Sequence, residues 1–112
     1  MLTALIAFAL QAAAAAPAPP DAVSRSGHAW AVCVKGRVDA GLRSSQAAEA
    51  LADAAIAGCA AELEAIRAAI EADSNAEIAA LNVERVRGGT KQTLIAYVAR
   101  ERGAGASPPQ AQ

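Results

Sequence analysis

QAAEALADAAIAGCAAELEAIRAAIEA, residues 46–72, repeats its apolar residues in alternating steps of four and three. That spacing is typical of a helix that buries a single face. It predicts a long helix over about 46–72, with Ser45 as its N-cap and Glu49 in its electropositive first turn. The buried face, called the seam below, consists of Ala52, Ile56, Cys59, Leu63, Ile66 and Ile70.

The segment before the seam carries a second apolar stripe. Its members, at helical offsets of 0, 3, 4 and 8, are Trp30, Cys33, Val34 and Val38. The spacing predicts a helix capped by Ser24 or Ser26 and running to about Leu42, with Gly41 marking its end.

The chain has two cysteines, and each falls on one of these apolar stripes. Cys33 and Cys59 are therefore predicted to face one interior and to form a disulfide that joins the two helices. With a tight turn near Arg43 the two cysteines would differ in level by about 6 Å. We therefore expect the chain to uncoil between Asp39 and Ser45.

After the seam, a third helix is predicted to begin at Asn75. Ser74 followed three residues later by Glu77 matches a capping box. Gly88 and Gly89 would break or kink this helix, which ends near Gly103. Its expected apolar side consists of Ile78, Leu81, Val86, Leu94, Ile95, Tyr97 and Val98. The alternative is a β-hairpin, pairing 83–87 with 93–98 across the two glycines.

The N-terminus has the pattern of a secretory signal. Residues 1–18 hold an apolar run followed by alanines, which predicts cleavage after Ala16 or Ala18 and a periplasmic or secreted protein. Residues 19–24 form a proline-rich lead, 25–102 a single helical domain, and 103–112 a disordered tail.

Together these segments predict an all-α fold, a disulfide-linked helical hairpin extended to a small three-helix bundle. The core is mostly alanine, which buries little apolar area for each residue ordered. A covalent link is therefore expected to supply part of the stability, about 3 kcal/mol for a loop of this length.

Charge is segregated along the chain. Residues 46–84 carry eight acidic residues against Arg67, whereas 25–45 and 85–112 carry net charges of +3 and +4. An antiparallel bundle with complementary neighbours would show this pattern. Binding of nucleic acid is not expected, since the basic residues lack interleaved aromatic residues.

No catalytic, cofactor or metal-binding constellation is expected. His28 is the only histidine, and Gly88–Lys91 lacks the spacing of a phosphate-binding loop. The function expected is therefore non-enzymatic binding of another exported protein, with Trp30 and Tyr97 as candidate contacts. The alternative is a membrane-surface protein that uses its basic C-terminal helix.

Overall fold

The computed structural model describes residues 22–106 and shows four helices in that part of the chain. They are α2 (Ala22–Gly41), α3 (Ala48–Gly58), α4 (Ala60–Asp73) and α5 (Ala76–Ala106). The predicted all-α fold is confirmed. Residues 83–98 lie wholly within α5, so the alternative of a β-hairpin is wrong. The expected signal sequence, residues 19–21 of the lead and residues 107–112 of the tail lie outside the described residues.

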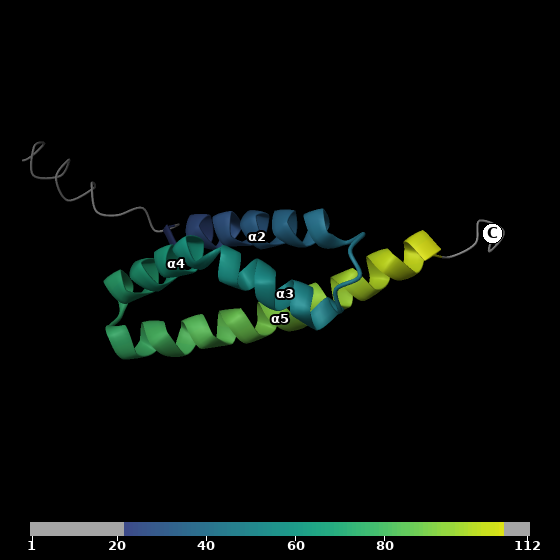
Figure 1. Cartoon of the computed structure of the whole chain (residues 1–112). Coiled ribbons are helices and arrows are strands. Elements are labelled where there is room, and N and C mark those ends of the chain that lie inside the picture. Colours follow the sequence, from purple (N-terminus) through teal and green to yellow (C-terminus); the bar gives the residue numbers. More distant parts are fainter. Residues whose placement is uncertain (1–21, 107–112) are drawn as a thin grey trace, which may run out of the picture.

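The helices form a three-sided bundle in which α3 and α4 follow one another along one side and α2 and α5 form the other two. Both α2 and α5 pack along α3 and α4, whereas α2 and α5 touch each other only sparsely (Figure 1). The core lies where the three sides meet, and its buried residues include Trp30, Val34, Val38, Leu51, Ala55, Leu63, Ile66, Val83, Leu94 and Val98. The predicted stripe of the first helix is confirmed, with Cys33 only partly buried.

The single helix predicted over 46–72 is wrong, because the chain leaves helical geometry at Cys59. Its φ and ψ of −112° and 31° separate α3 from α4. The backbone remains hydrogen-bonded across the break: Cys59 N–H donates to the Ile56 carbonyl at 3.1 Å, and the Cys59 carbonyl accepts from Leu63 N–H at 3.2 Å. The seam stays buried through the break, with Ile70 only partly so.

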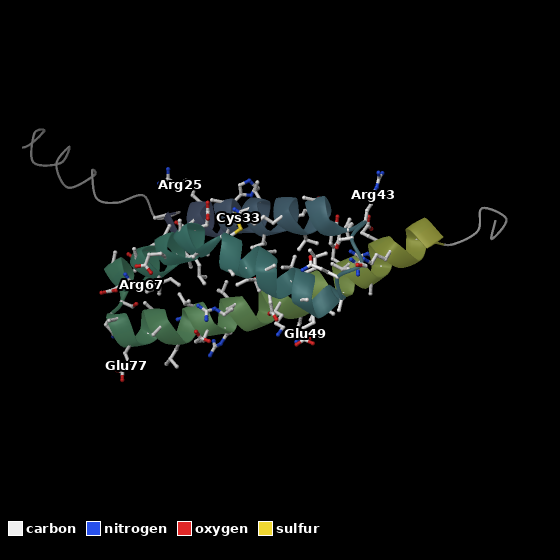
Figure 2. All side chains as sticks on the ribbon, viewed as in Figure 1. Arg25, Cys33, Arg43, Glu49, Arg67 and Glu77 are labelled. Atoms are coloured by element: carbon white, nitrogen blue, oxygen red, sulfur yellow. A yellow bond between two sulfur atoms is a disulfide. The ribbon has the colours of Figure 1, made fainter. Side chains whose placement is uncertain are left out.

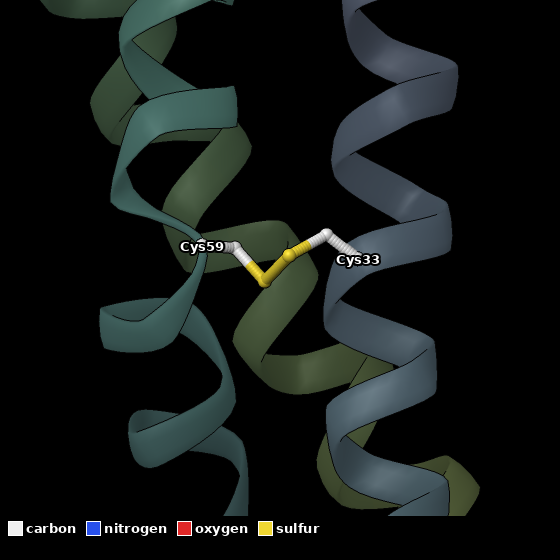
Figure 3. The surroundings of a disulfide bond; sticks show 2 residues. All are labelled: Cys33 and Cys59. Carbon is white, nitrogen blue, oxygen red and sulfur yellow. A yellow bond between two sulfur atoms is a disulfide. The ribbon is translucent and has the colours of Figure 1, made fainter.

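The predicted disulfide between Cys33 and Cys59 is confirmed. Their Cα atoms lie 6.1 Å apart, and Figure 3 shows Cys59 at the point where the ribbon thins between α3 and α4. The expected uncoiling between Asp39 and Ser45 is confirmed, since α2 ends at Gly41 and residues 42–47 form the connector. The non-helical connector and the break at Cys59 together bring the two cysteines to the same height along the bundle.

The predicted caps at the start of α2 and α3 are wrong. The chain is already helical at Ala22, so Ser24 and Ser26 lie inside α2, as do the last residues of the proline-rich lead. Ala47, not Ser45, precedes α3, while the Ser44 hydroxyl donates to the Gly41 carbonyl at 2.8 Å. Glu49 lies in the first turn of α3 as predicted.

The start of α5 is capped by a neighbour of the predicted residue. Asn75 Oδ1 accepts from Ile78 N–H at 2.9 Å, whereas the Ser74 hydroxyl donates to the Ile70 carbonyl at 2.7 Å. A side-chain acceptor three residues before the N–H is the usual N-cap arrangement. The predicted start is therefore right to within one residue, but Asn75 rather than Ser74 does the capping.

Gly88 and Gly89 do not break α5, which stays helical to Ala106 and past the expected end at Gly103. The ribbon is curved but continuous in Figure 1. Both glycines are exposed, and a Cβ built on either would meet no atom within 4 Å. They therefore lie outside the buried stripe, whose packing offsets the roughly 1 kcal/mol that each glycine costs a helix.

The apolar side of α5 differs from the prediction in its first two turns. Ile78 and Leu81 are exposed, by 43% and 65%, while Ala79 and Val83 are buried instead. Further along, Leu94 and Val98 are buried as expected, and Val86, Ile95 and Tyr97 pack against the core.

Arg102 joins the end of α5 to the connector between α2 and α3. Its guanidinium donates to the carbonyls of Leu42 at 3.0 Å, Gln46 at 2.6 Å, Ser44 at 3.1 Å and Gly41 at 3.5 Å. Arginine suits this place because it presents five donors in a rigid plane. These four bonds, called the Arg102 clasp below, satisfy carbonyls that the non-helical connector leaves without helical partners.

Complementary charge joins α5 to α3. Lys91 Nζ lies 3.1 Å from a carboxylate oxygen of both Glu49 and Asp53. This contact agrees with the expectation that the basic flank of the sequence packs beside its acidic middle. None of the charged residues described is buried, and Arg43 and Glu77 project outwards in Figure 2. Among residues 22–106, no helix combines the length and the apolar content that crossing a membrane would require.

Candidate binding groove between α2 and α5

The sparse contact between α2 and α5 leaves a groove of about 550 Å³ between them. Volumes of about 300–1,000 Å³ are usual for pockets that bind small molecules. The apolar floor of the groove is formed by Trp30, Ala31, Val34, Val86 and Leu94. Its remaining lining residues are Lys35, Arg85, Gly89, Thr90, Thr93, Tyr97 and Arg100.

Trp30 is anchored at the base of the groove. Its side chain is 3% exposed, and its indole N–H donates to Thr90 Oγ1 at 3.1 Å. A buried indole N–H without a partner would carry a desolvation cost, which this bond removes. Thr90 lies four residues after Val86 and four before Leu94, and this helical spacing places it on the same side of α5.

Tyr97 lies in a cluster of charged groups at one end of the groove. Its hydroxyl donates to Asp39 Oδ1 at 2.5 Å, and Lys35 Nζ donates to the other Asp39 oxygen at 2.8 Å. Lys35 Nζ and Arg100 Cζ lie 5.3 and 5.9 Å from the centre of the tyrosine ring. Cations at such distances are attracted by the face of the ring. The cluster thus fixes Tyr97 and holds two cations over it.

These contacts shift the pKa values of the cluster in a consistent way. The bond from Lys35, and then the bond from Tyr97, lower the pKa of the Asp39 carboxyl. The bond to Asp39 raises the pKa of Lys35. The Asp39 carboxylate also raises the pKa of the Tyr97 phenol above 10.0, although Lys35 opposes this effect. At neutral pH the cluster is therefore held as a carboxylate, an ammonium and a neutral phenol.

Tyr97 is the only tyrosine of the chain, so its ionisation can be followed directly by ultraviolet absorbance. We expect the folded protein to form phenolate at a higher pH than the urea-unfolded protein. Because the folded pKa is the higher one, the Asp39–Tyr97 bond stabilises the fold below pH 10.0 and is lost as pH rises through the folded pKa.

The matched variant for this titration is Asp39→Asn, which keeps the size of the side chain and removes its charge. It should bring the Tyr97 transition back towards that of the unfolded chain. A folded wild-type protein whose tyrosine ionises at or below pH 10.0 would contradict the bond.

The charged residues that line the groove are all basic. Lys35 stands on α2, and Arg85 and Arg100 stand on α5. In the described part of the chain, Arg85 and Arg100 form no ion pair, whereas nearby Arg87 contacts Glu84 at 3.4 Å. By contrast, a hollow between α3, α4 and α5 mixes both signs, with Asp53, Glu64, Arg67 and Arg87. The α2–α5 groove is therefore distinguished by an apolar floor beside two α5 arginines that have no carboxylate partner among the described residues.

The structure brings the two candidate contact residues from the sequence into this one groove. Trp30 supplies part of its floor and is too buried to act as a projecting contact, whereas Tyr97 is half-buried at one end. From the sequence, Arg85 and Arg100 are considered only as part of the basic C-terminal helix of the membrane-surface alternative, and Thr90 is not predicted as a contact. The one signal in the sequence is helical spacing. Thr90 lies four residues after Val86, and Arg85 lies four residues before Gly89, so each shares a face of the helix with a residue that lines the groove.

Other residues considered from the sequence have structural surroundings. His28 is exposed on α2. A carboxylate oxygen of Glu62 lies within 4.8 Å of both cysteine sulfurs, but the disulfide removes the thiolates that a metal would require. Within Gly88–Lys91, Thr90 binds Trp30 and Lys91 binds α3.

The site thus belongs to a disulfide-linked helical domain with a cationic, apolar-floored groove. The chain matches no protein-family model, and no curated protein or solved structure is significantly similar to it.

Proposed function

We propose that this chain is a small exported, non-enzymatic module that binds another protein through the α2–α5 groove. The observation that carries the proposal is the groove itself: an apolar floor containing Trp30, flanked by Arg85 and Arg100, which form no ion pair in the described region. Apolar centres with charged edges are typical of protein interfaces, and tryptophan, tyrosine and arginine are enriched in them.

Export is supported by two features of different kinds. The N-terminal sequence has the order of a secretory signal, an apolar run before small residues. The Cys33–Cys59 bond is of a kind that persists in oxidising compartments. The proposed site of action is therefore the periplasm or the extracellular space.

The membrane-surface alternative requires an exposed apolar face near the end of α5. Leu94 and Val98 of that face are buried, and the Arg102 guanidinium is engaged by the connector. The observations therefore favour a protein partner over a membrane surface.

The proposal is tested by site-specific photo-crosslinking in the producing cells. A photo-reactive amino acid replaces Thr93, an exposed lining residue of the groove, or Ala68, an exposed residue of α4 that does not line it. We expect a discrete adduct of one size from position 93 and none from position 68. Equal adducts from both positions, or none from either, would contradict a binding groove.

A further inference from the structure

We propose that the occupant of the groove is an acidic, amphipathic α-helix of the partner protein. This inference rests on the proposed function, and it adds the secondary structure and the charge of the bound segment. It is carried by the shape of the groove and by the sign of the charges along it.

The shape of the groove fits a helix. Helices α2 and α5 both pack on the α3–α4 layer without packing closely on each other. A further helix laid along the groove, over the Trp30–Thr90 and Asp39–Tyr97 contacts, would have a helical wall on each side and would complete a four-helix arrangement. The lining of α5 extends from Arg85 to Arg100, about 22 Å at the helical rise, which matches a partner helix of about 15 residues.

The burial of the floor favours a helix over a flexible acyl chain. Trp30, Val34 and Leu94 are 3–5% exposed, so they present only their edges to the groove. An acyl chain resting on those edges would leave much of its own surface in water. A helix brings an apolar stripe of its own and keeps its polar side outwards, as in other complexes where a helix occupies a groove.

The charge of the groove selects an acidic helix. Arg85 and Arg100 on the α5 wall form no ion pair in the described region and would face the bound helix, whereas the charge of Lys35 on the α2 wall is paired with Asp39. Glutamates beside the apolar stripe of the partner would reach these cations, whereas lysines at the same places would be repelled. Asp39 does not line the groove and is already bonded to Lys35 and Tyr97, so the two arginines leave the charge along the groove positive.

The wall formed by α5 allows close approach and continues beyond the groove. A Cβ on Gly89 would meet no atom within 4 Å, so a partner backbone can come near α5 at that turn. Leu81 and Ile78 lie four and seven residues before Arg85, on the same face, and are 65% and 43% exposed. A longer partner helix would cover these two residues as well.

The test uses the oxidised protein and three synthetic helical peptides of about 15 residues, the length that matches the groove. They share one leucine stripe, and the positions flanking it are glutamate, glutamine or lysine. Binding is measured by calorimetry and by the fluorescence of Trp30, the only tryptophan of the chain. We expect the glutamate peptide to bind at least about tenfold more tightly than the glutamine peptide, and the lysine peptide not to bind.

Two pairs of variants locate the binding. Arg85→Glu/Arg100→Glu should weaken the glutamate peptide at least about tenfold, while Arg43→Glu/Arg87→Glu makes the same change of charge outside the groove and should have a smaller effect. Gly89→Phe fills the groove and should abolish binding. Gly88→Phe, at a neighbouring open position that does not line the groove, should preserve it.

The outcomes separate this inference from the proposed function. Equal binding of the three peptides, or binding that Gly89→Phe leaves intact, would overturn the inference. So would crosslinks from position 93 in cells together with no peptide binding, although the proposed function would then stand. Co-sedimentation with phosphatidylglycerol vesicles, lost in Arg85→Glu/Arg100→Glu and accompanied by no peptide binding, would overturn it in favour of a lipid.

Discussion

Replacing both Cys33 and Cys59 with serine should leave most of the protein unfolded at about 37 °C. Closing a loop across 26 residues contributes about 3 kcal/mol through the unfolded chain. Cys59 is fully buried, so serine would also place a hydroxyl in the apolar seam. A domain of this size has about 5 kcal/mol of stability in total. The measurement is thermal unfolding followed by helical circular dichroism, with and without reductant.

The double alanine variant is the matched control for the hydroxyl. It loses the covalent link without burying a new polar group, so it should be destabilised by less than the serine variant. An oxidised wild-type protein whose unfolding midpoint is unchanged by reductant would show that the bond has no structural role. Two free thiols in protein taken from an oxidising compartment would refute the pairing itself.

Trp30→Ala should destabilise the fold by about 3–5 kcal/mol, comparable with the whole stability of the domain. Trp30 is the largest side chain of the core and is 3% exposed, so alanine would leave a cavity that α2 and α5, which touch only sparsely, cannot readily close. The loss would also remove part of the floor of the groove. Urea unfolding followed by circular dichroism measures the change.

Two further variants separate the volume of Trp30 from its hydrogen bond. Thr90→Val keeps the indole and removes its acceptor, which should cost about 1–3 kcal/mol. Trp30→Phe loses the same hydrogen bond but only part of the side-chain volume. Its loss of stability should therefore fall between those of Thr90→Val and Trp30→Ala. A Trp30→Ala protein as stable as the wild type would show that the indole does not support the core.

The spacing of apolar residues predicts most of the helical segments and, together with the presence of two cysteines, the disulfide, because the buried face of a helix follows from local periodicity. Residues of the seam from Ala52 to Ile66 are buried as their spacing indicates. The break at Cys59 has little local signal beyond Gly58, because the disulfide to α2 and packing against two helices are tertiary effects. The predicted break at Gly88 and Gly89 is wrong for a related reason. Glycine has a low helix propensity, but packing on the opposite side of α5 stabilises the helix through these two residues.

The groove was less predictable than the fold. Trp30 and Tyr97 were singled out by residue type, yet the arrangement around them depends on the angle between two helices that scarcely touch. The bonds to Asp39 and Thr90 join residues 58 and 60 positions apart. Periodicity within one helix carries no information about such pairs, so the basic character of the groove emerges only once α2 and α5 are placed.

The Arg102 clasp, unlike the disulfide, depends on the end of α5. The four carbonyls that it binds precede it by 56 to 61 residues, whereas the disulfide spans 26. The disulfide can join α2 to α3 and α4 without any part of α5, whereas the carbonyls of Leu42, Ser44 and Gln46 reach the guanidinium only when the end of α5 packs beside the connector. Loss of the last turns of α5 would therefore leave the covalent link in place and release the connector.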